Sequence, residues 1–252
     1  TLSMKKLHWL FMAVCLAVVP LLQSCDDKDG YSVGDFTPPL WATVRVTGNA
    51  FYLDCDVWGT LWPVNTDIGW YDAVDGQRVI TVFNPLQDNY AGYDHAVKLL
   101  RLQNILTKEV ETLTPETEED FGNDPVFINK GDISISGGYM NIFFMQNLPF
   151  STEQKHRISL VRPQKDDALY GEDGYIHLEL RYNDYDDLSG RRGLGAVSYN
   201  LNSLEISSET KGIKLKLNSE KNGEVEVTFD LKTVGSNEKL TTNVDLSNMQ
   251  LK

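Results

Sequence analysis

Hydrophobic and polar residues alternate with a period of two in many short segments of this chain. In segment 51–58 every second residue is apolar or a cysteine, and the residues between them are aromatic or acidic. The same alternation returns at residues 176–182, 213–217 and 225–231. Because successive side chains of a β-strand point to opposite faces, the pattern predicts half-buried antiparallel strands and an all-β protein.

Turn signals separate these segments. Asn222-Gly223 lies between two alternating runs and is typical of a tight β-hairpin. Only segment 94–110 could form a long helix, since its leucines and isoleucines fit a period of 3.6 about as well as a period of 2. The residues alone leave helix and strand open there.

The chain has 252 residues, which suits two domains better than one. The composition changes at residues 115–124, where an acidic run is flanked by prolines. We therefore predict a linker at 115–124 between two domains. Residues 40–114 have the size of a small five-stranded barrel, and residues 125–252 that of a β-sandwich.

The N-terminus has the layout of a bacterial signal peptide. Lys5 and Lys6 precede an apolar run over residues 9–22, which is too short to span a bilayer as a helix. The run ends at Leu22-Gln23-Ser24-Cys25, which resembles a lipobox. We expect residues 1–24 to be removed and Cys25 to carry lipid; an ordinary secretory signal with a nearby cysteine is the alternative.

Residues 25–39 are polar, acidic and rich in glycine, serine and proline, as in a solvated tether. The aspartates directly after Cys25 resemble a surface-export signal, although a plain solvated linker explains them equally well. The expected location is the outer membrane, facing the periplasm or the cell surface, with the acyl chains on Cys25 as the anchor.

Charge and cysteine content limit the kinds of partner and the covalent cross-links that the protein can have. Residues 1–24 hold two basic and no acidic residues, so their removal takes the net charge from −13 to −15. Such a charge repels phosphate backbones, which argues against nucleic-acid binding. Cys55 is then the one free thiol of the mature chain, which excludes an intramolecular disulfide.

The sequence carries no catalytic or metal-binding signature. The histidines at 95, 156 and 177 lack zinc-site spacing, and no P-loop, Gly-x-Ser-x-Gly or dinucleotide-binding motif is present. We expect no cofactor, no metal and no enzymatic activity. Paired carboxylates for polysaccharide hydrolysis stay a third alternative, because such pairs meet only in the fold.

Aromatic residues gather in the N-terminal domain. Tyr52, Asp54, Asp56 and Trp58 share the polar side of one predicted strand, so rings and hydrogen-bond acceptors would point the same way. Rings that stack on a sugar beside carboxylates that accept from its hydroxyls are typical of saccharide sites. The alternative is that the aromatic residues of this region pack under the second domain or fill the end of the small barrel.

Three segments carry a family resemblance: Gly137-Gly138-Tyr139-Met140-Asn141-Ile142, Leu178-Glu179-Leu180-Arg181-Tyr182-Asn183 and Val197-Ser198-Tyr199-Asn200-Leu201. With the lipobox, they resemble the NigD-like lipoproteins over nearly the whole mature chain. The resemblance implies an N-terminal OB-type barrel, a C-terminal β-sandwich, and strand structure in 94–110. Tyr182 stands where the family is associated with histidine, and the resemblance supplies no catalytic residue.

Together these observations favour a non-enzymatic cell-envelope lipoprotein that binds a glycan or a surface partner protein. The alternative function is a bacteriocin accessory or immunity protein, since the family takes its name from a bacteriocin locus.

Overall fold

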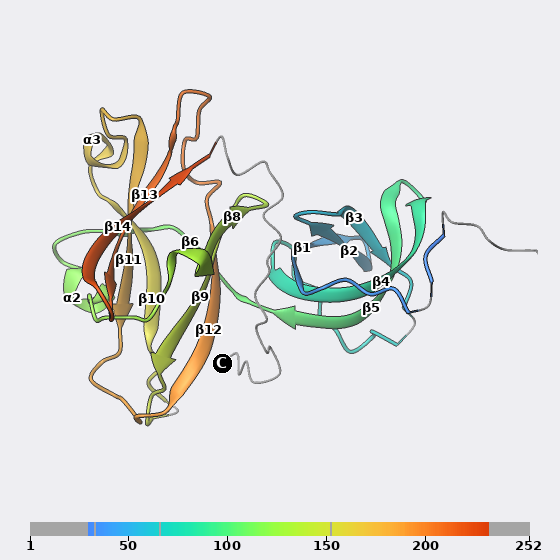
Figure 1. Ribbon diagram of the computed structural model, residues 1–252, viewed down its shortest axis with the longest axis horizontal. Coiled ribbons are helices and arrows are strands. Elements are labelled where there is room, and N and C mark those ends of the chain that lie inside the picture. Colours follow the sequence, from blue (N-terminus) through green and yellow to red (C-terminus); the bar gives the residue numbers. More distant parts are fainter. Residues whose placement is uncertain (1–29, 33, 66, 152, 232–252) are drawn as a thin grey trace, which may run out of the picture.

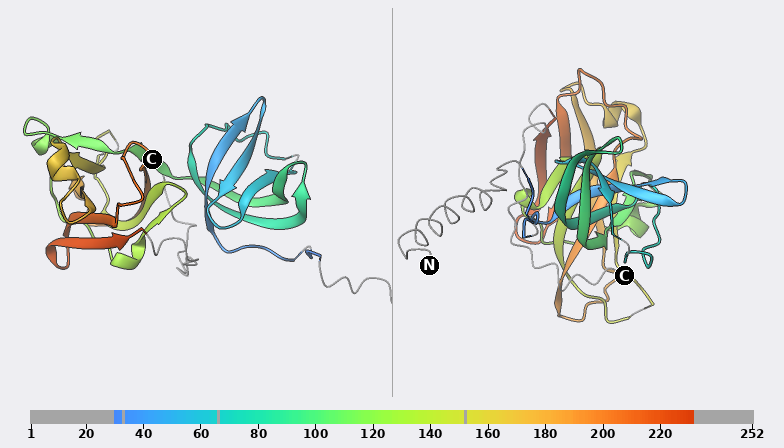
Figure 2. Two further views of the ribbon diagram at one scale, coloured as in Figure 1. Left: turned by 90° about the horizontal axis from the view of Figure 1, so that it is seen from above. Right: turned by 90° about the vertical axis from the view of Figure 1, so that its right-hand side faces the viewer.

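A computed structural model describes residues 30–32, 34–65, 67–151 and 153–231. It contains a barrel at one end and a sandwich at the other (Figure 1), and the view from above shows the same side-by-side arrangement (Figure 2, left). The predicted signal peptide at 1–24 and the predicted lipidation residue Cys25 lie outside the described residues. Within the described residues no helix is long and apolar enough to cross a membrane.

The N-terminal domain is a closed five-stranded barrel with strand order β1-β2-β3-β5-β4. Its core consists of the inward residues of each strand, such as Val44, Leu53, Leu61 and Phe83, all fully buried. The strands are β1 (Leu40–Thr47), β2 (Ala50–Cys55), β3 (Gly59–Pro63), β4 (Arg78–Tyr90) and β5 (Tyr93–Asn104). The barrel closes where β3 pairs in parallel with β5.

The C-terminal domain packs a five-stranded sheet, β14-β13-β11-β10-β7, and a four-stranded sheet, β6-β12-β9-β8, around one apolar core. The strands are β6 (Leu106–Glu109), β7 (Glu111–Leu113), β8 (Ile133–Ser136), β9 (Tyr139–Asn147), β10 (Arg157–Pro163), β11 (Tyr175–Asn183), β12 (Arg192–Asn200), β13 (Gly212–Ser219) and β14 (Gly223–Asp230). Most pairs are antiparallel, but β10–β7, β11–β13 and β12–β6 are parallel.

This architecture confirms the predicted all-β class, a small OB-type barrel followed by a β-sandwich. The ambiguous segment 94–110 is extended: it forms most of β5 and all of β6. Tertiary pairing decides this segment, because β5 bonds to both β3 and β4 to close the barrel.

The boundary between the domains lies earlier than the sequence indicated. Strands β6 and β7 belong to the sandwich sheets, so the barrel ends near Asn104 and not at 114. Segment 115–124 is no free linker: it contains the short helix α2 (Glu118–Phe121), and Phe121 is 3% exposed.

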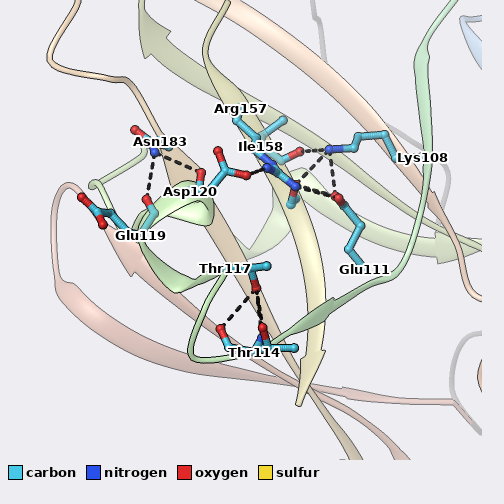
Figure 3. Close-up of polar contacts among 10 residues, drawn as sticks. Lys108, Glu111, Thr114, Thr117, Glu119, Asp120, Arg157, Ile158 and Asn183 are labelled. Carbon is cyan, nitrogen blue, oxygen red and sulfur yellow. Dashed lines mark hydrogen bonds and ion pairs between the residues drawn. The ribbon is translucent and has the colours of Figure 1, made fainter. Parts of the chain in front are cut away.

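Polar contacts hold α2 to the sandwich (Figure 3). The side chain of Arg157 on β10 pairs with Asp120 and with Glu111, and its guanidinium lies 4.1 Å from the Phe121 ring centroid. Asn183 on β11 donates to the Asp120 carbonyl at 3.0 Å. The acidic composition that suggested a solvated linker therefore supplies ion-pair partners for a neighbouring strand.

The predicted tether at 25–39 is docked on the barrel in its described part. The backbone N–H of Thr37 donates to the Phe83 carbonyl at 2.9 Å, and the Asn84 amide donates to the Ser32 carbonyl at 3.0 Å. Tyr31 donates from its hydroxyl to Asp88 at 2.7 Å. Polar composition predicted a free segment because these partners lie about fifty residues away in sequence.

Candidate functional site

The four residues of the predicted strip do not form one surface. Strand β2 ends at Cys55, and residues 56–58 form a turn, so the two-residue alternation stops there. Tyr52 and Asp54 lie on the outer face of β2. Asp56 turns into the domain interface and Trp58 turns back onto the barrel core.

Asp56 forms a buried ion pair with Arg78, the first residue of β4. The two guanidinium nitrogens donate to the two carboxylate oxygens at 2.8 and 2.7 Å, and the side chains are 0% and 5% exposed. Arg78 also donates to Thr43 of β1 at 3.0 Å and to Asn141 of β9 at 3.1 Å. The pair therefore joins barrel and sandwich.

The surroundings of the pair are closely packed. The Arg78 guanidinium carbon lies 5.6 Å from the Trp41 ring centroid and 4.7 Å from that of Tyr139. The β8–β9 turn covers it with Gly137, whose φ is +60° and where a Cβ would lie 2.5 Å from Asp56 Oδ1. Only glycine fits this turn, and the buried pair with its packed surroundings forms a structural joint between the domains.

An apolar cluster completes this joint. Barrel residues Trp41, Ile80 and Ile105 pack against Phe143 and Ala196 of the sandwich, and each is at most 6% exposed. Rings and aliphatic side chains buried this fully hold the domains together by the hydrophobic effect. The alternative raised from sequence, that aromatic residues pack under the second domain, thus holds for Trp41.

Trp58 belongs to a second aromatic group on the barrel. Its ring packs edge-on against Phe83 and His95, with centroids 5.4 and 5.0 Å apart. The Tyr31 ring centroid lies 6.3 Å from that of Trp58. Hydrogen bonds from Tyr31 and His95 lower the pKa of Asp88, which keeps this carboxylate charged. The group fastens the N-terminal segment, and Trp58 serves the core.

A third aromatic group lies on the outer face of the barrel and is half-buried. The Tyr93 ring centroid lies 4.8 Å from that of Trp62 and 5.1 Å from that of Tyr52, with interplanar angles of 31° and 51°. Three strands, β2, β3 and β5, contribute one ring each. We call Tyr52, Trp62 and Tyr93 the aromatic face.

Carboxylates border the aromatic face. Asp54 is exposed and pairs across the ladder with Thr60. Asp94 accepts from the Thr60 backbone N–H at 2.7 Å and from its hydroxyl at 2.8 Å, and these bonds lower the pKa of Asp94. Gly59, with φ of +70°, allows this approach, since a Cβ there would lie 2.4 Å from Asp94 Oδ2.

Sequence reasoning missed Trp62 and Tyr93 as partners of Tyr52. Trp62 had a signal, because it alternates with the inward Leu61 and therefore points outward like Tyr52. Tyr93 had none: the parallel β3–β5 pairing joins segments about thirty residues apart.

Within the described residues we find neither a metal site nor a reactive cysteine beside the aromatic face. They contain no group of three or more His, Cys, Asp or Glu residues able to hold a metal ion. Cys55 is 3% exposed, and this burial raises the pKa of its thiol to about 11. A thiol that is buried and protonated is a core residue and not a nucleophile.

Comparison with known proteins agrees with the two-domain architecture. A family model described as the NigD-like N-terminal OB domain matches residues 41–105, and one described as the NigD-like C-terminal beta sandwich domain matches residues 109–231. A search of curated proteins found no match.

Three solved structures share the fold. A protein of unknown function from Bacteroides vulgatus is 29% identical, with a TM-score of 0.74 and coverage of 86% of this chain and 100% of that one. A protein from Parabacteroides distasonis named as toxin related is 30% identical, with a TM-score of 0.64 and coverage of 77% and 92%. A NigD-like immunity protein from Bacteroides caccae is 17% identical, with a TM-score of 0.55 and coverage of 78% and 93%. With both domain models matched in order over residues 41–231, the chain belongs to the NigD-like family.

Proposed function

We propose that this protein is a non-enzymatic cell-envelope lipoprotein that binds saccharide through the aromatic face of its barrel. One observation carries the proposal: the ring of Tyr93 contacts those of Tyr52 and Trp62 on the outer face of three adjacent strands. Exposed carboxylates lie beside these rings. Asp54 stays in the proposed site. Asp56 and Trp58 are not part of it, because Asp56 is buried in the joint between the domains and Trp58 packs on the barrel core.

Physical chemistry favours a sugar as the ligand. OB-type barrels bind oligonucleotides or oligosaccharides on the face formed by their second and third strands. A mature net charge of −15 and carboxylates beside the rings disfavour phosphate backbones. Aromatic rings offer flat apolar surfaces to sugar C–H groups, and Asp54 and Asp94 can accept from hydroxyls.

The expected affinity for a free saccharide is low. Ring contacts contribute on the order of 1 kcal/mol each, so three rings alone give weak binding. Many copies anchored on one surface compensate through effective concentration. We propose that acyl chains on Cys25 provide this anchoring in the outer membrane.

Glycan arrays and tryptophan fluorescence test the proposal. The mature protein should bind a subset of bacterial surface oligosaccharides, and Trp62→Ala should abolish binding while leaving Tm nearly unchanged. Trp70→Ala is the matched control, because Trp70 is 69% exposed and lies outside the aromatic face. Equal loss in both variants, or binding that survives Trp62→Ala, would contradict the assignment, and release of reducing ends would contradict the non-enzymatic role.

The anchor has its own test. Cys25→Ala should move the protein from the membrane fraction to the soluble fraction and abolish labelling by a palmitate analogue. Labelling that persists in Cys25→Ala would refute lipidation at this residue.

Relatives named as an immunity protein and as toxin related support a second candidate function, that of a bacteriocin accessory or immunity protein. In that role the protein would occupy a toxin or its receptor. Expression of this protein in a bacteriocin-sensitive strain should then raise the survival of that strain in the presence of the bacteriocin. Unchanged survival with every bacteriocin encoded by neighbouring genes would exclude the immunity function.

A further inference from the structure

The N-terminal segment and the aromatic face lie at the same part of the barrel. Tyr31 is held by its hydrogen bond to Asp88 and by its ring contact with Trp58. Asp88 pairs with His95 across the β4–β5 hairpin, and the next pair towards the tip is Tyr90 with Tyr93. Tyr93, the central ring of the aromatic face, is therefore two residues, about 7 Å of strand, from the docking point of Tyr31.

The covalent path from the anchor to this point is short. Tyr31 follows Cys25 by six residue steps, and a fully extended chain of that length spans at most about 21 Å. If 25–39 were a free tether, its fifteen residues would span about 50 Å before the barrel begins. Docking of the segment therefore shortens the effective tether by more than half.

The sandwich lies at the opposite end of the molecule. In Figure 1 the described N-terminal residues start beside the barrel, on the side away from the sandwich. Phe36, Leu86 and Tyr90, which are 70%, 44% and 36% exposed, belong to this segment and to the β4–β5 hairpin. Apolar and aromatic side chains of this kind are favourable at a membrane–water interface. With lipid on Cys25, the barrel would face the membrane and the sandwich would project from it.

We infer that the saccharide bound by the aromatic face is the headgroup of a glycolipid in the same membrane that holds the lipid anchor. This inference rests on the proposed function and adds the source of the sugar. A short, docked tether keeps the rings close to lipid headgroups, and this confinement raises the effective concentration of a headgroup sugar for a weak site. A free polysaccharide gains nothing from such a tether.

Vesicles distinguish the two sources. The lipidated protein is reconstituted in phosphatidylcholine vesicles with or without lipopolysaccharide that ends at its core oligosaccharide. Binding is followed by tryptophan fluorescence, and Trp62→Ala gives the background signal of the other tryptophans. The released core oligosaccharide is titrated separately as the soluble probe. The decisive variant carries a twenty-residue Gly-Ser insertion between Asp29 and Gly30, and the control carries the same segment after Lys252.

The insertion lengthens the chain between Cys25 and Tyr31 from six to twenty-six residue steps. Since effective concentration falls as about the −3/2 power of length, apparent binding on vesicles should weaken about ninefold, while binding of the released oligosaccharide should not change. Tyr31→Ala combined with Asn84→Ala removes the side-chain contacts that hold Tyr31, Ser32 and Asp35. This double variant should free the segment as far as Thr37 and weaken apparent vesicle binding about threefold. The C-terminal control should match the unmodified protein.

Two outcomes overturn the inference in different ways. If the unmodified protein binds the released oligosaccharide and the insertion leaves vesicle binding unchanged, the glycolipid inference is wrong and the saccharide site stands. If the protein binds neither the released oligosaccharide nor the vesicles, while a glycan array is also negative, the proposed function itself fails.

Discussion

The buried Asp56–Arg78 pair predicts a large and specific loss of stability when the carboxylate is removed. In Asp56→Ala the Arg78 guanidinium stays fully buried between Trp41 and Tyr139 but loses its counter-ion. Two charge-assisted hydrogen bonds at 2.8 and 2.7 Å disappear, and Thr43 and Asn141 stay as neutral partners only.

Removing one partner of a buried ion pair costs about 3–5 kcal/mol, because the remaining charge is left uncompensated in a medium of low dielectric constant. For a protein of about 200 folded residues, each kcal/mol lowers Tm by about 2–4 °C, so Tm should fall by about 6–20 °C. Replacing both partners, as in Asp56→Ala with Arg78→Met, should cost less than the sum of the two single changes, since no unpaired charge remains.

Urea unfolding and differential scanning calorimetry measure this effect. Glu220→Gln is the control: it removes a surface pair with Arg192 whose side chains are 39% and 41% exposed, and Tm should barely change. If Asp56→Ala is no more destabilised than Glu220→Gln, or if the double variant shows full additivity, then the ion pair does not secure the joint between the domains.

Three further predictions concern the cores of the two domains. Cys55, whose pKa burial raises to about 11, should resist iodoacetamide in the folded protein at neutral pH and react after unfolding in urea; rapid labelling of the native Cys25→Ala protein would contradict this. Gly212→Ala should destabilise by about 1–3 kcal/mol, because a Cβ there would lie 2.0 Å from the Phe229 carbonyl oxygen, whereas Gly131→Ala, with nothing within 4 Å, should be neutral in the same urea titration. Burial raises the pKa of Tyr71 to about 12, so between pH 10 and 12 the unfolded chain loses this proton while the folded chain keeps it; stability should fall over that range, and a Tm that is flat from pH 9 to 12 would refute the sign.

The alternation of side chains predicted most of the fold because each strand buries one face. Segment 213–217, for example, falls within β13, and all but the last residue of segment 225–231 falls within β14. The two strands pair as a hairpin around Asn222-Gly223, as the turn signal indicated. The alternation does not indicate which strands pair with each other. The assignment of β6 and β7 to the sandwich, and hence the domain boundary, depends on parallel pairing with strands about fifty and ninety residues later.

The candidate site was predicted in part for the same reason. Tyr52 and Asp54 lie on the outer face because the alternation holds up to Cys55. It fails at Asp56 and Trp58, where the chain turns and where distant Arg78 and Phe83 offer better partners than solvent. Local periodicity records the direction of a side chain within a strand, and tertiary contacts decide it in a turn.

The central claim is that saccharide binds at Trp62 and at no other tryptophan of the folded domains. Labelling with 5-fluorotryptophan gives each position its own fluorine resonance, and Trp41, Trp58 and Trp70 serve as internal controls that are buried, half-buried and 69% exposed. On titration with an oligosaccharide that binds, the Trp62 resonance should shift in a saturable way while those of Trp41 and Trp70 stay in place. A saturable shift at Trp70 without one at Trp62 would place the ligand elsewhere and contradict the aromatic face as the binding site.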